Sequence, residues 1–266
     1  MSNYIFSQKN LGFSVEYYLY EKHNVMPAKI YPPHVADTLE VYILLDGDVS
    51  FSIENNLYKL STGDVIISKP NQIHNCILNS NSVHKHLCFW FTPSSDFIFE
   101  KLLNVKSNLI IPSPEDKNKL SMIYSDIKTA SEEDDQLKKY ALIVNMIEII
   151  SRHVDTANPE QCAPPILKEI LDDLNQNFTK INSLSYFTNK FSISSSTLNR
   201  LFKINLNTSP KLYLETKRLA YSRILLKQGE SVNDAYVKAG FPDYSNFIRL
   251  FKKRFNITPH RYKHEK

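Results

Sequence analysis

The stretch Phe202-Lys-Ile-Asn-Leu-Asn-Thr-Ser-Pro210 decides the fold, because its pattern returns as Phe251-Lys-Lys-Arg-Phe-Asn-Ile-Thr-Pro259. Both copies contain Phe-Lys, an Asn four residues after the Lys, and then Ser-Pro or Thr-Pro. An Asn can adopt the left-handed conformation that ends a helix, and a Ser-Pro or Thr-Pro dipeptide often begins the next helix. The repeat therefore indicates a duplicated helical unit.

Residues 165–266 are predicted to be entirely helical around this repeat. Caps, turns and apolar residues at helical spacing predict helices at 165–178, 183–190, 194–206, 209–227, 232–239 and 243–255. The turns at 191–193 and 240–241 give two helix-turn-helix motifs, 183–203 and 232–255. In such a motif the second helix enters the major groove, so two motifs on one connector can reach successive grooves about 34 Å apart.

The charge of the chain is divided unevenly. Residues 165–266 contain 18 Lys and Arg against 8 Asp and Glu, a balance of +10, whereas the first 164 residues contain 14 against 20, a balance of −6. A local positive field supports binding to phosphates, although a lysine-rich domain can also be basic only for solubility.

Outward-facing side chains of the two second helices are the candidate DNA contacts. Asn and Arg can each make paired hydrogen bonds to base edges, Ser and Tyr offer weaker contacts, and Lys holds phosphates. The candidates are Ser196, Asn199, Arg200 and Lys203 in the first motif, and Tyr244, Ser245, Asn246, Arg249, Lys252 and Lys253 in the second. Arg254 is a further candidate phosphate contact. For each of them a solvated helix face is the alternative interpretation.

Residues 1–111 are predicted to be strands. The run from Glu40 ends at Asp46-Gly47, a hairpin signal, and apolar residues then alternate with polar ones from Val49 to Glu54. Further strands are predicted at 57–60 and 65–67. Short strands at this spacing are typical of an antiparallel sandwich or barrel.

Residues 112–154 are predicted to form a helical hairpin. In its second helix an apolar stripe from Leu137 through Tyr140, Val144 and Ile147 is wider than one packing contact needs. We therefore expect dimerisation through it, the alternative being that both helices only cover the strands. The Pro-rich, non-periodic segment 155–164 is predicted to be an interdomain linker.

Composition excludes several other classes. The chain has three cysteines without a CxxC pair, five glycines without a nucleotide-binding motif, and neither a secretory signal nor a long apolar segment. We expect a cytoplasmic protein with no cofactor and no membrane partner.

The helical part resembles the AraC/XylS family of bacterial transcription regulators. The resemblance lies in Arg218-Leu219, in Gly240-Phe-Pro-Asp-Tyr-Ser-Asn-Phe-Ile-Arg-Leu-Phe-Lys252 and in Asn256-Ile-Thr-Pro-His-Arg-Tyr262. The positions that contact bases in the family fall here on Ser196, Asn199, Arg200, Tyr244, Ser245, Asn246 and Arg249. The family's usual glycines are here Asn207 and Asn256, and Tyr236 stands where a small residue is common. The resemblance implies a sequence-specific DNA-binding regulator that is not an enzyme.

The strand-rich part resembles the cupin barrel, a double-stranded β-helix, that serves as the effector domain in many relatives. The expected fold is thus multidomain α and β: a barrel with a helical hairpin, then an all-α DNA-binding domain. Metal-binding cupins use three His and a Glu. His34, Glu40 and His74 fit three of these positions, but Ala36 stands at the fourth.

The candidate effector-binding residues are His34, Glu40, Tyr42, His74 and Trp90. A strand at 83–91 places His84, His86, Cys88 and Trp90 on one face, and the sequence leaves open whether this face lines the pocket. Hydrogen bonding to an effector is the main hypothesis and no metal is assigned. A metal-dependent cupin enzyme with a basic tail is one alternative, and a regulator without any ligand is another.

The expected partners are double-stranded DNA, a small molecule that we take to be a sugar because the family often serves carbohydrate use, a second copy of the chain, and RNA polymerase. Effector binding would change how the two DNA-binding motifs are presented, which requires different effector affinities in two states.

Overall fold

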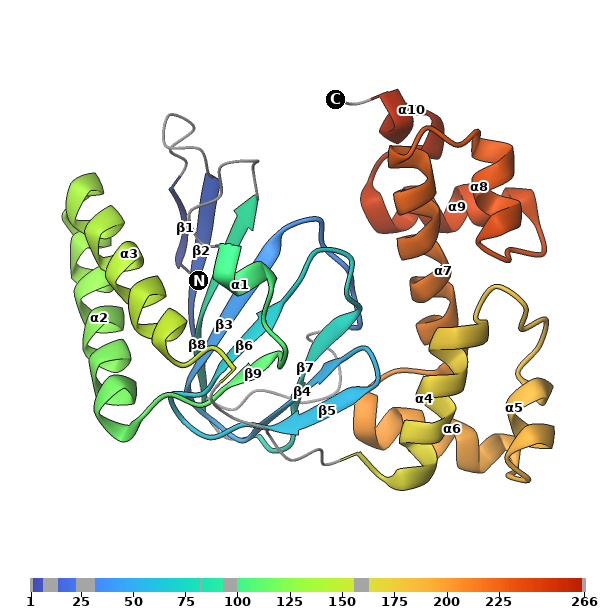
Figure 1. Ribbon diagram of the computed structural model, residues 1–266, viewed down its shortest axis with the longest axis horizontal. Coiled ribbons are helices and arrows are strands. Elements are labelled where there is room, and N and C mark those ends of the chain that lie inside the picture. The colour runs from blue at the N-terminus through green and yellow to red at the C-terminus, as the bar shows by residue number, and fades with distance from the viewer. Residues whose placement is uncertain are drawn as a thin grey trace.

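The computed structural model describes residues 2–6, 14–22, 32–81, 83–92, 100–155 and 163–264. The N-terminal half contains two antiparallel sheets that face each other, followed by a helical hairpin, and the C-terminal half is entirely helical (Figure 1). This confirms the expected fold class of an antiparallel β domain with a helical hairpin, followed by an all-α domain. Residues 156–162, most of the expected linker, lie outside the described residues.

The larger sheet has the order β1-β2-β8-β3-β6-β9 and the smaller one β5-β4-β7. The strands are β1 (Ser2–Phe6), β2 (Ser14–Lys22), β3 (Leu39–Asp46), β4 (Val49–Ile53), β5 (Asn56–Lys59), β6 (Val65–Ser68), β7 (His74–Leu78), β8 (His84–Thr92) and β9 (Leu109–Ile110). The predicted strands of residues 40–67 are present, whereas β7 and β9 were not predicted individually.

Alternation along β3 and β8 separates two cores. Leu39, Val41 and Ile43 of β3 belong to the core that also contains Leu87, Phe89 and Phe91 of β8 and the buried residues of the helical hairpin. The opposite faces of the same strands point toward the smaller sheet, where Tyr42, Cys88 and Phe51 belong to a second core. The structure therefore answers the question that the sequence left open: the face with His84, His86, Cys88 and Trp90 is the inner one.

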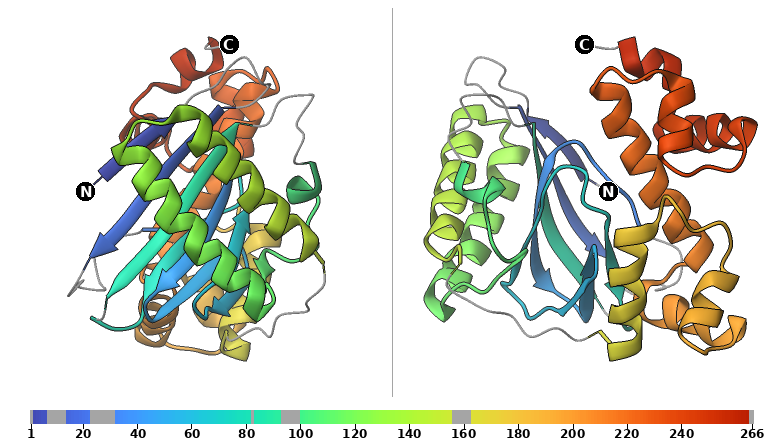
Figure 2. Two further views of the ribbon diagram at one scale, coloured as in Figure 1. Left: turned by 90° about the vertical axis from the view of Figure 1, so that its left-hand side faces the viewer. Right: turned by 45° about the vertical axis from the view of Figure 1, so that its right-hand side comes forward.

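Helices α1 (Glu100–Leu103), α2 (Pro114–Glu132) and α3 (Gln136–Arg152) follow the strands, and α2 and α3 pack side by side on the outer face of the larger sheet (Figure 2). At the start of the predicted apolar stripe on α3, Leu137 is 79% exposed. Further along the same stripe and its extension, Ile143, Met146, Ile147 and Ile150 are buried. The apolar surface of α3 is thus divided between residues buried in the core with the larger sheet and the exposed Leu137.

The C-terminal half contains seven helices among its described residues: α4 (Pro165–Asn177), α5 (Ser185–Lys190), α6 (Ser195–Leu206), α7 (Pro210–Lys227), α8 (Val232–Lys238), α9 (Tyr244–Phe255) and α10 (Pro259–His264). Asn207 and Asn256 end α6 and α9 with φ of 49° and 58°, the left-handed conformation that the sequence predicted. The long helix α7 joins two helical groups, α4 to α6 and α8 to α10 (Figure 1).

The two halves of the chain are in contact. Val35 and Ile73 of the β domain are buried in the same core as helices α4 to α7. Polar contacts surround this packing: Tyr213 Oη donates to the Glu54 carbonyl at 2.7 Å, and Asn75 Nδ2 donates to the Leu206 carbonyl at 3.1 Å.

Candidate DNA-binding surface and ligand site

Helices α6 and α9 are built alike from their first residue. Ser194 and Asp243 cap them, each accepting a hydrogen bond from the backbone amide three residues later. Such a cap fixes where the helix begins and so which residues face outward. Leu198, Phe202 and Leu206 are the buried residues of α6, and Phe247 and Phe251 are those of α9.

The candidate DNA contacts lie on the opposite faces of these helices. Ser196, Asn199, Arg200, Lys203, Tyr244, Ser245, Arg249, Lys252 and Lys253 are all exposed, and Asn246 is half-buried. Several of them make local hydrogen bonds. Asn199 Nδ2 donates to the Ser195 carbonyl at 2.8 Å, and Arg249 Nη2 donates to Asn246 Oδ1 at 2.7 Å. These bonds hold the side chains along the outer face of each helix.

Arg254 differs from the expectation that it holds a phosphate. It is half-buried, and its Nη2 donates to the Pro33 carbonyl at 3.3 Å, so it joins α9 to the β domain. Burial, followed by the nearby Arg223 charge, lowers the pKa of Arg254. The helix phase alone could not reveal this contact, because its partner lies 221 residues away in the sequence.

The two helix-turn-helix motifs are held together by α7 and the loop after α4. Arg218 of α7 is buried and donates to the carbonyls of Phe178, at 3.0 Å, and Ile181, at 2.5 Å. Gly240, in the turn of the second motif, has a φ of 81° and lies directly against the backbone of Thr179. Tyr236 of α8 packs on the rings of Tyr244 and Phe247, so the large side chain is accommodated without loss of the motif.

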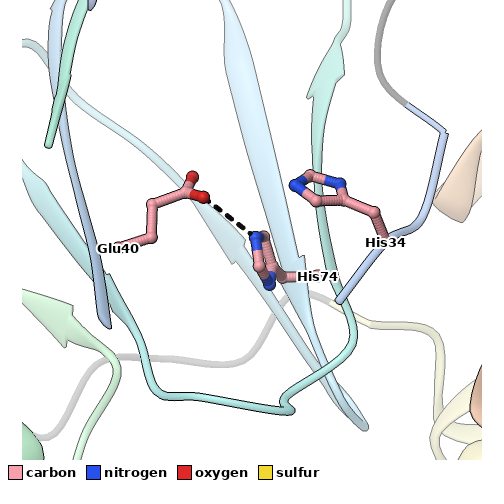
Figure 3. A group of neighbouring side chains, drawn as sticks. All are labelled: His34, Glu40 and His74. Carbon is pink, nitrogen blue, oxygen red and sulfur yellow. Dashed lines mark hydrogen bonds and ion pairs between the residues drawn. The ribbon is translucent and has the colours of Figure 1, made fainter. Parts of the chain in front are cut away.

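The candidate ligand site lies on the inner faces of the sheets. Glu40 of β3 accepts a hydrogen bond at its Oε2 from Trp90 Nε1 at 2.8 Å, and the same oxygen lies 3.3 Å from His74 Nε2. His34 completes the group, with its ring centroid 4.3 Å from that of His74 (Figure 3). The structure therefore brings His34, Glu40, His74 and Trp90 together.

Electrostatic interactions tie these groups to one another. Burial alone would raise the pKa of Glu40, but the charge of His74 and hydrogen bonds from His74 and Trp90 lower it to about 2. Burial alone would lower the pKa of His74, but the Glu40 carboxylate outweighs burial and raises it. Desolvation and the neighbouring His74 lower the pKa of His34 to about 4. Glu40 and His74 thus favour each other's charged forms, whereas burial and His74 disfavour the charged form of His34.

Tyr42 belongs to a neighbouring polar group rather than to this one. Its hydroxyl lies 2.9 Å from His84 Nε2, and its ring stacks on His86 with centroids 4.7 Å apart. Burial lowers the pKa of His84 to about 4. His84 and His86 were not among the candidate residues, although their alternation with Trp90 along one strand was the available signal.

Comparison with known proteins agrees with this geometry. Residues 187–265 match the model of a helix-turn-helix domain, and residues 19–123 match the model of the AraC-like ligand binding domain. The chain belongs to the AraC family of transcriptional regulators.

Similar proteins of this family align along most of the chain. The activator RhaR from Mannheimia succiniciproducens is 23% identical over 243 residues, which cover 88% of this chain and 87% of RhaR. The lactose operon transcription activator of Staphylococcus xylosus is 25% identical and covers 84% and 83% of the two chains. Among solved structures, one of ToxT from Vibrio cholerae covers 96% of this chain and 98% of its own at 16% identity, with a TM-score of 0.37.

Membership of the AraC family confirms a DNA-binding transcription regulator with a ligand-binding domain, and not an enzyme. No helix in the described part of the chain is long and apolar enough to span a membrane.

Proposed function

We propose that this AraC-family chain reads a specific DNA sequence with α6 and α9 and responds to a small molecule bound on the inner face of its β domain. In this proposal residues 1–111 bind the effector, 112–154 dimerise, 155–164 connect the domains and 165–266 bind DNA. The observation that carries the proposal is the pair of capped helices with matching polar faces, both exposed while their apolar faces are buried.

Direct base contacts are assigned to the side chains that can make paired hydrogen bonds. These are Asn199 and Arg200 on α6, and Asn246 and Arg249 on α9, with weaker contacts from Ser196, Tyr244 and Ser245. Lys203, Lys252 and Lys253 contact phosphates, which position the protein without selecting a sequence.

The effector is proposed to be a sugar that contacts His34, Glu40, His74 and Trp90, with Tyr42 beside them. Trp90 of this polar group packs against the apolar inner core, and an apolar lining with a few polar groups is the usual composition of a small-molecule site. Support for a sugar comes from the relative that activates a lactose operon. A ligand that binds the native state must raise the melting temperature, so a thermal-shift screen of sugars tests this assignment. No shift with any sugar would favour a regulator without this ligand.

We further propose that the protein is a homodimer in the cytoplasm. The dimer contacts RNA polymerase and activates transcription. Dimerisation is assigned to α2 and α3 because each exposes a large apolar side chain, Met122 at 68% and Leu137 at 79%. Activation is supported by the names of the similar regulators.

Salt dependence of DNA binding tests the phosphate contacts. The logarithm of the affinity should fall linearly with the logarithm of salt concentration, by about 0.9 for each neutralised phosphate. Lys252→Ala and Lys253→Ala should each weaken binding to all sequences and reduce that slope by about 1. Lys138→Ala, an exposed lysine at the start of α3, is the matched control and should leave the slope unchanged. An unaltered slope in both α9 variants would remove Lys252 and Lys253 from the DNA interface.

A further inference from the structure

Three potential metal ligands converge at one point of the β domain. One ligand atom each from His34, Glu40 and His74 lies within 4.8 Å of the others. In Figure 3 a ring nitrogen of His34 faces the space beside Glu40 and His74. The three residues come from separate segments: the chain before β3, β3 itself and the start of β7.

Backbone carbonyls orient both imidazole rings. His34 Nδ1 donates to the Pro32 carbonyl at 3.2 Å, and His74 Nδ1 donates to the Gln72 carbonyl at 3.0 Å. In each case the acceptor lies two residues earlier in the chain. Metal-binding histidines almost always donate their second ring nitrogen in this way, which leaves Nε2 to face the ion. An ion bound here would displace the proton that His74 Nε2 shares with Glu40, because a ligating imidazole must be neutral.

The backbone also holds the two histidines next to each other. His34 and His74 exchange both backbone hydrogen bonds, at 3.0 and 2.9 Å, in an isolated antiparallel bridge. Their side chains therefore project to the same side, and a shift of one residue in this pairing would separate them.

The spacing between Glu40 and His74 suits two ligands of one ion. Their Oε2 and Nε2 atoms are 3.3 Å apart, longer than the 2.7–2.9 Å usual for a charged hydrogen bond. Two ligand atoms each about 2.1 Å from an ion, with an angle of about 105° at the ion, are separated by about 3.3 Å. Trp90 Nε1, at 2.8 Å from Glu40 Oε2, fixes the carboxylate in this position.

We propose that His34, Glu40 and His74 bind one divalent transition-metal ion of the Fe²⁺, Mn²⁺ or Zn²⁺ class. Two imidazoles and one carboxylate leave further coordination positions of the ion open. In this proposal oxygen atoms of the effector occupy those positions. The inference rests on the proposed function in one respect, since it takes this group as the ligand site of the regulator. The ion itself can be tested without DNA or effector.

Cobalt binding to the full-length protein tests the site. Protein stripped with a chelator and dialysed is titrated with Co²⁺, whose visible absorption reports nitrogen and oxygen ligands. We expect one ion per chain and competition by Zn²⁺. His34→Ala and Glu40→Gln should each lower the affinity at least tenfold, because loss of even an outer-shell partner costs about 10–100-fold. Glu40→Gln keeps the shape of the side chain, and circular dichroism confirms that each variant is folded.

His260→Ala is the matched control, because His260 and His264 lie one turn apart on α10, with ring centroids 4.9 Å apart, and could bind cobalt adventitiously. This variant should retain the high-affinity ion. Cobalt binding that survives in folded His34→Ala and Glu40→Gln, or its absence from folded wild-type protein, would overturn the proposal. DNA binding by the metal-free protein is measured separately, so a failure of the metal site and a failure of the regulator function remain distinguishable.

Discussion

Asp173 shows at the scale of one residue how the first DNA-binding motif is held in place. Its carboxylate lies on α4 and is buried, and its Oδ1 accepts hydrogen bonds from Asn177 at 2.7 Å, Tyr186 at 3.1 Å and Lys190 at 2.6 Å. Tyr186 and Lys190 belong to α5, so this single acceptor fixes α5 against α4. Helix α6 contacts α5, and all three helices contribute buried residues to one core.

Asp173→Ala should lower the free energy of unfolding by about 1–3 kcal/mol, because three donors lose their acceptor. Burial alone would raise the pKa of Asp173, but the hydrogen bonds, led by Lys190, lower it. The stabilisation is therefore complete above the unfolded pKa of about 3.9 and is lost as the pH falls through the lower folded value. Urea unfolding at pH 7 and at successively lower pH measures both effects.

Glu169→Ala, at an exposed position of the same helix, serves as the control and should change the unfolding free energy by less than about 0.5 kcal/mol. Equal losses in the two variants would mean that helix propensity, not the Asp173 contacts, explains the effect.

At the scale of elements, the turn of the second motif depends on the absence of a side chain at Gly240. Gly240 and Gly229 both have a positive φ, of 81° and 94°. A Cβ at Gly240 would overlap the backbone of Thr179, whereas a Cβ at Gly229 would meet nothing within 4 Å. Substitutions at the two positions therefore distinguish the cost of backbone strain from the cost of steric overlap.

Gly229→Ala should cost about 1–2 kcal/mol of stability from the left-handed backbone alone. Gly240→Ala should cost about 1–3 kcal/mol more, because the loop at Thr179 must move away. Thermal unfolding of both variants gives the difference. Similar losses in the two would show that the loop after α4 yields freely and does not hold the motifs together.

The helical elements were predictable because their signals are local. Caps such as Ser194 and the left-handed Asn207 and Asn256 act within a few residues, so α6, α7 and α9 follow from sequence alone. Strand β7 has five buried residues and no alternation, and the two residues of β9 are too few to show any. The apolar stripe of α3 was visible in the sequence, but which of its residues are buried depends on the sheet that the helix packs against.

At the scale of the whole molecule, the β domain contributes directly to the DNA-binding half. Tyr213 of α7 donates to the Glu54 carbonyl, and the Glu54 carboxylate pairs with Lys217 of the same helix. Arg223 of α7 donates to Asn71 at 2.7 Å. No local pattern indicates these contacts, because they join residues more than 150 positions apart. His34, Glu40 and His74 could be named as candidates from their spacing in the sequence. That they lie close together depends on pairing between distant segments, such as the bridge between His34 and His74.

Tyr213→Phe should remove the bond to Glu54 while its ring still packs on Phe202, so we expect a loss of about 0.5–1.5 kcal/mol. Because the contact spans both halves, the loss should appear in signals from the Trp90 indole as well as from the helices. Tyr221→Phe on the same helix, where the ring packs on Phe178, is the control. A loss confined to the helical signal would mean that the two halves unfold independently.

Selection of binding sites from random DNA tests the central claim, that α6 and α9 read successive major grooves. The selected sequence should contain two separate blocks about 10–10.5 base pairs apart, centre to centre. Arg200→Ala should relax base preference in one block only and Arg249→Ala in the other only, each by about 1–3 kcal/mol. A single block, or two blocks that both arginine variants leave intact, would contradict the account.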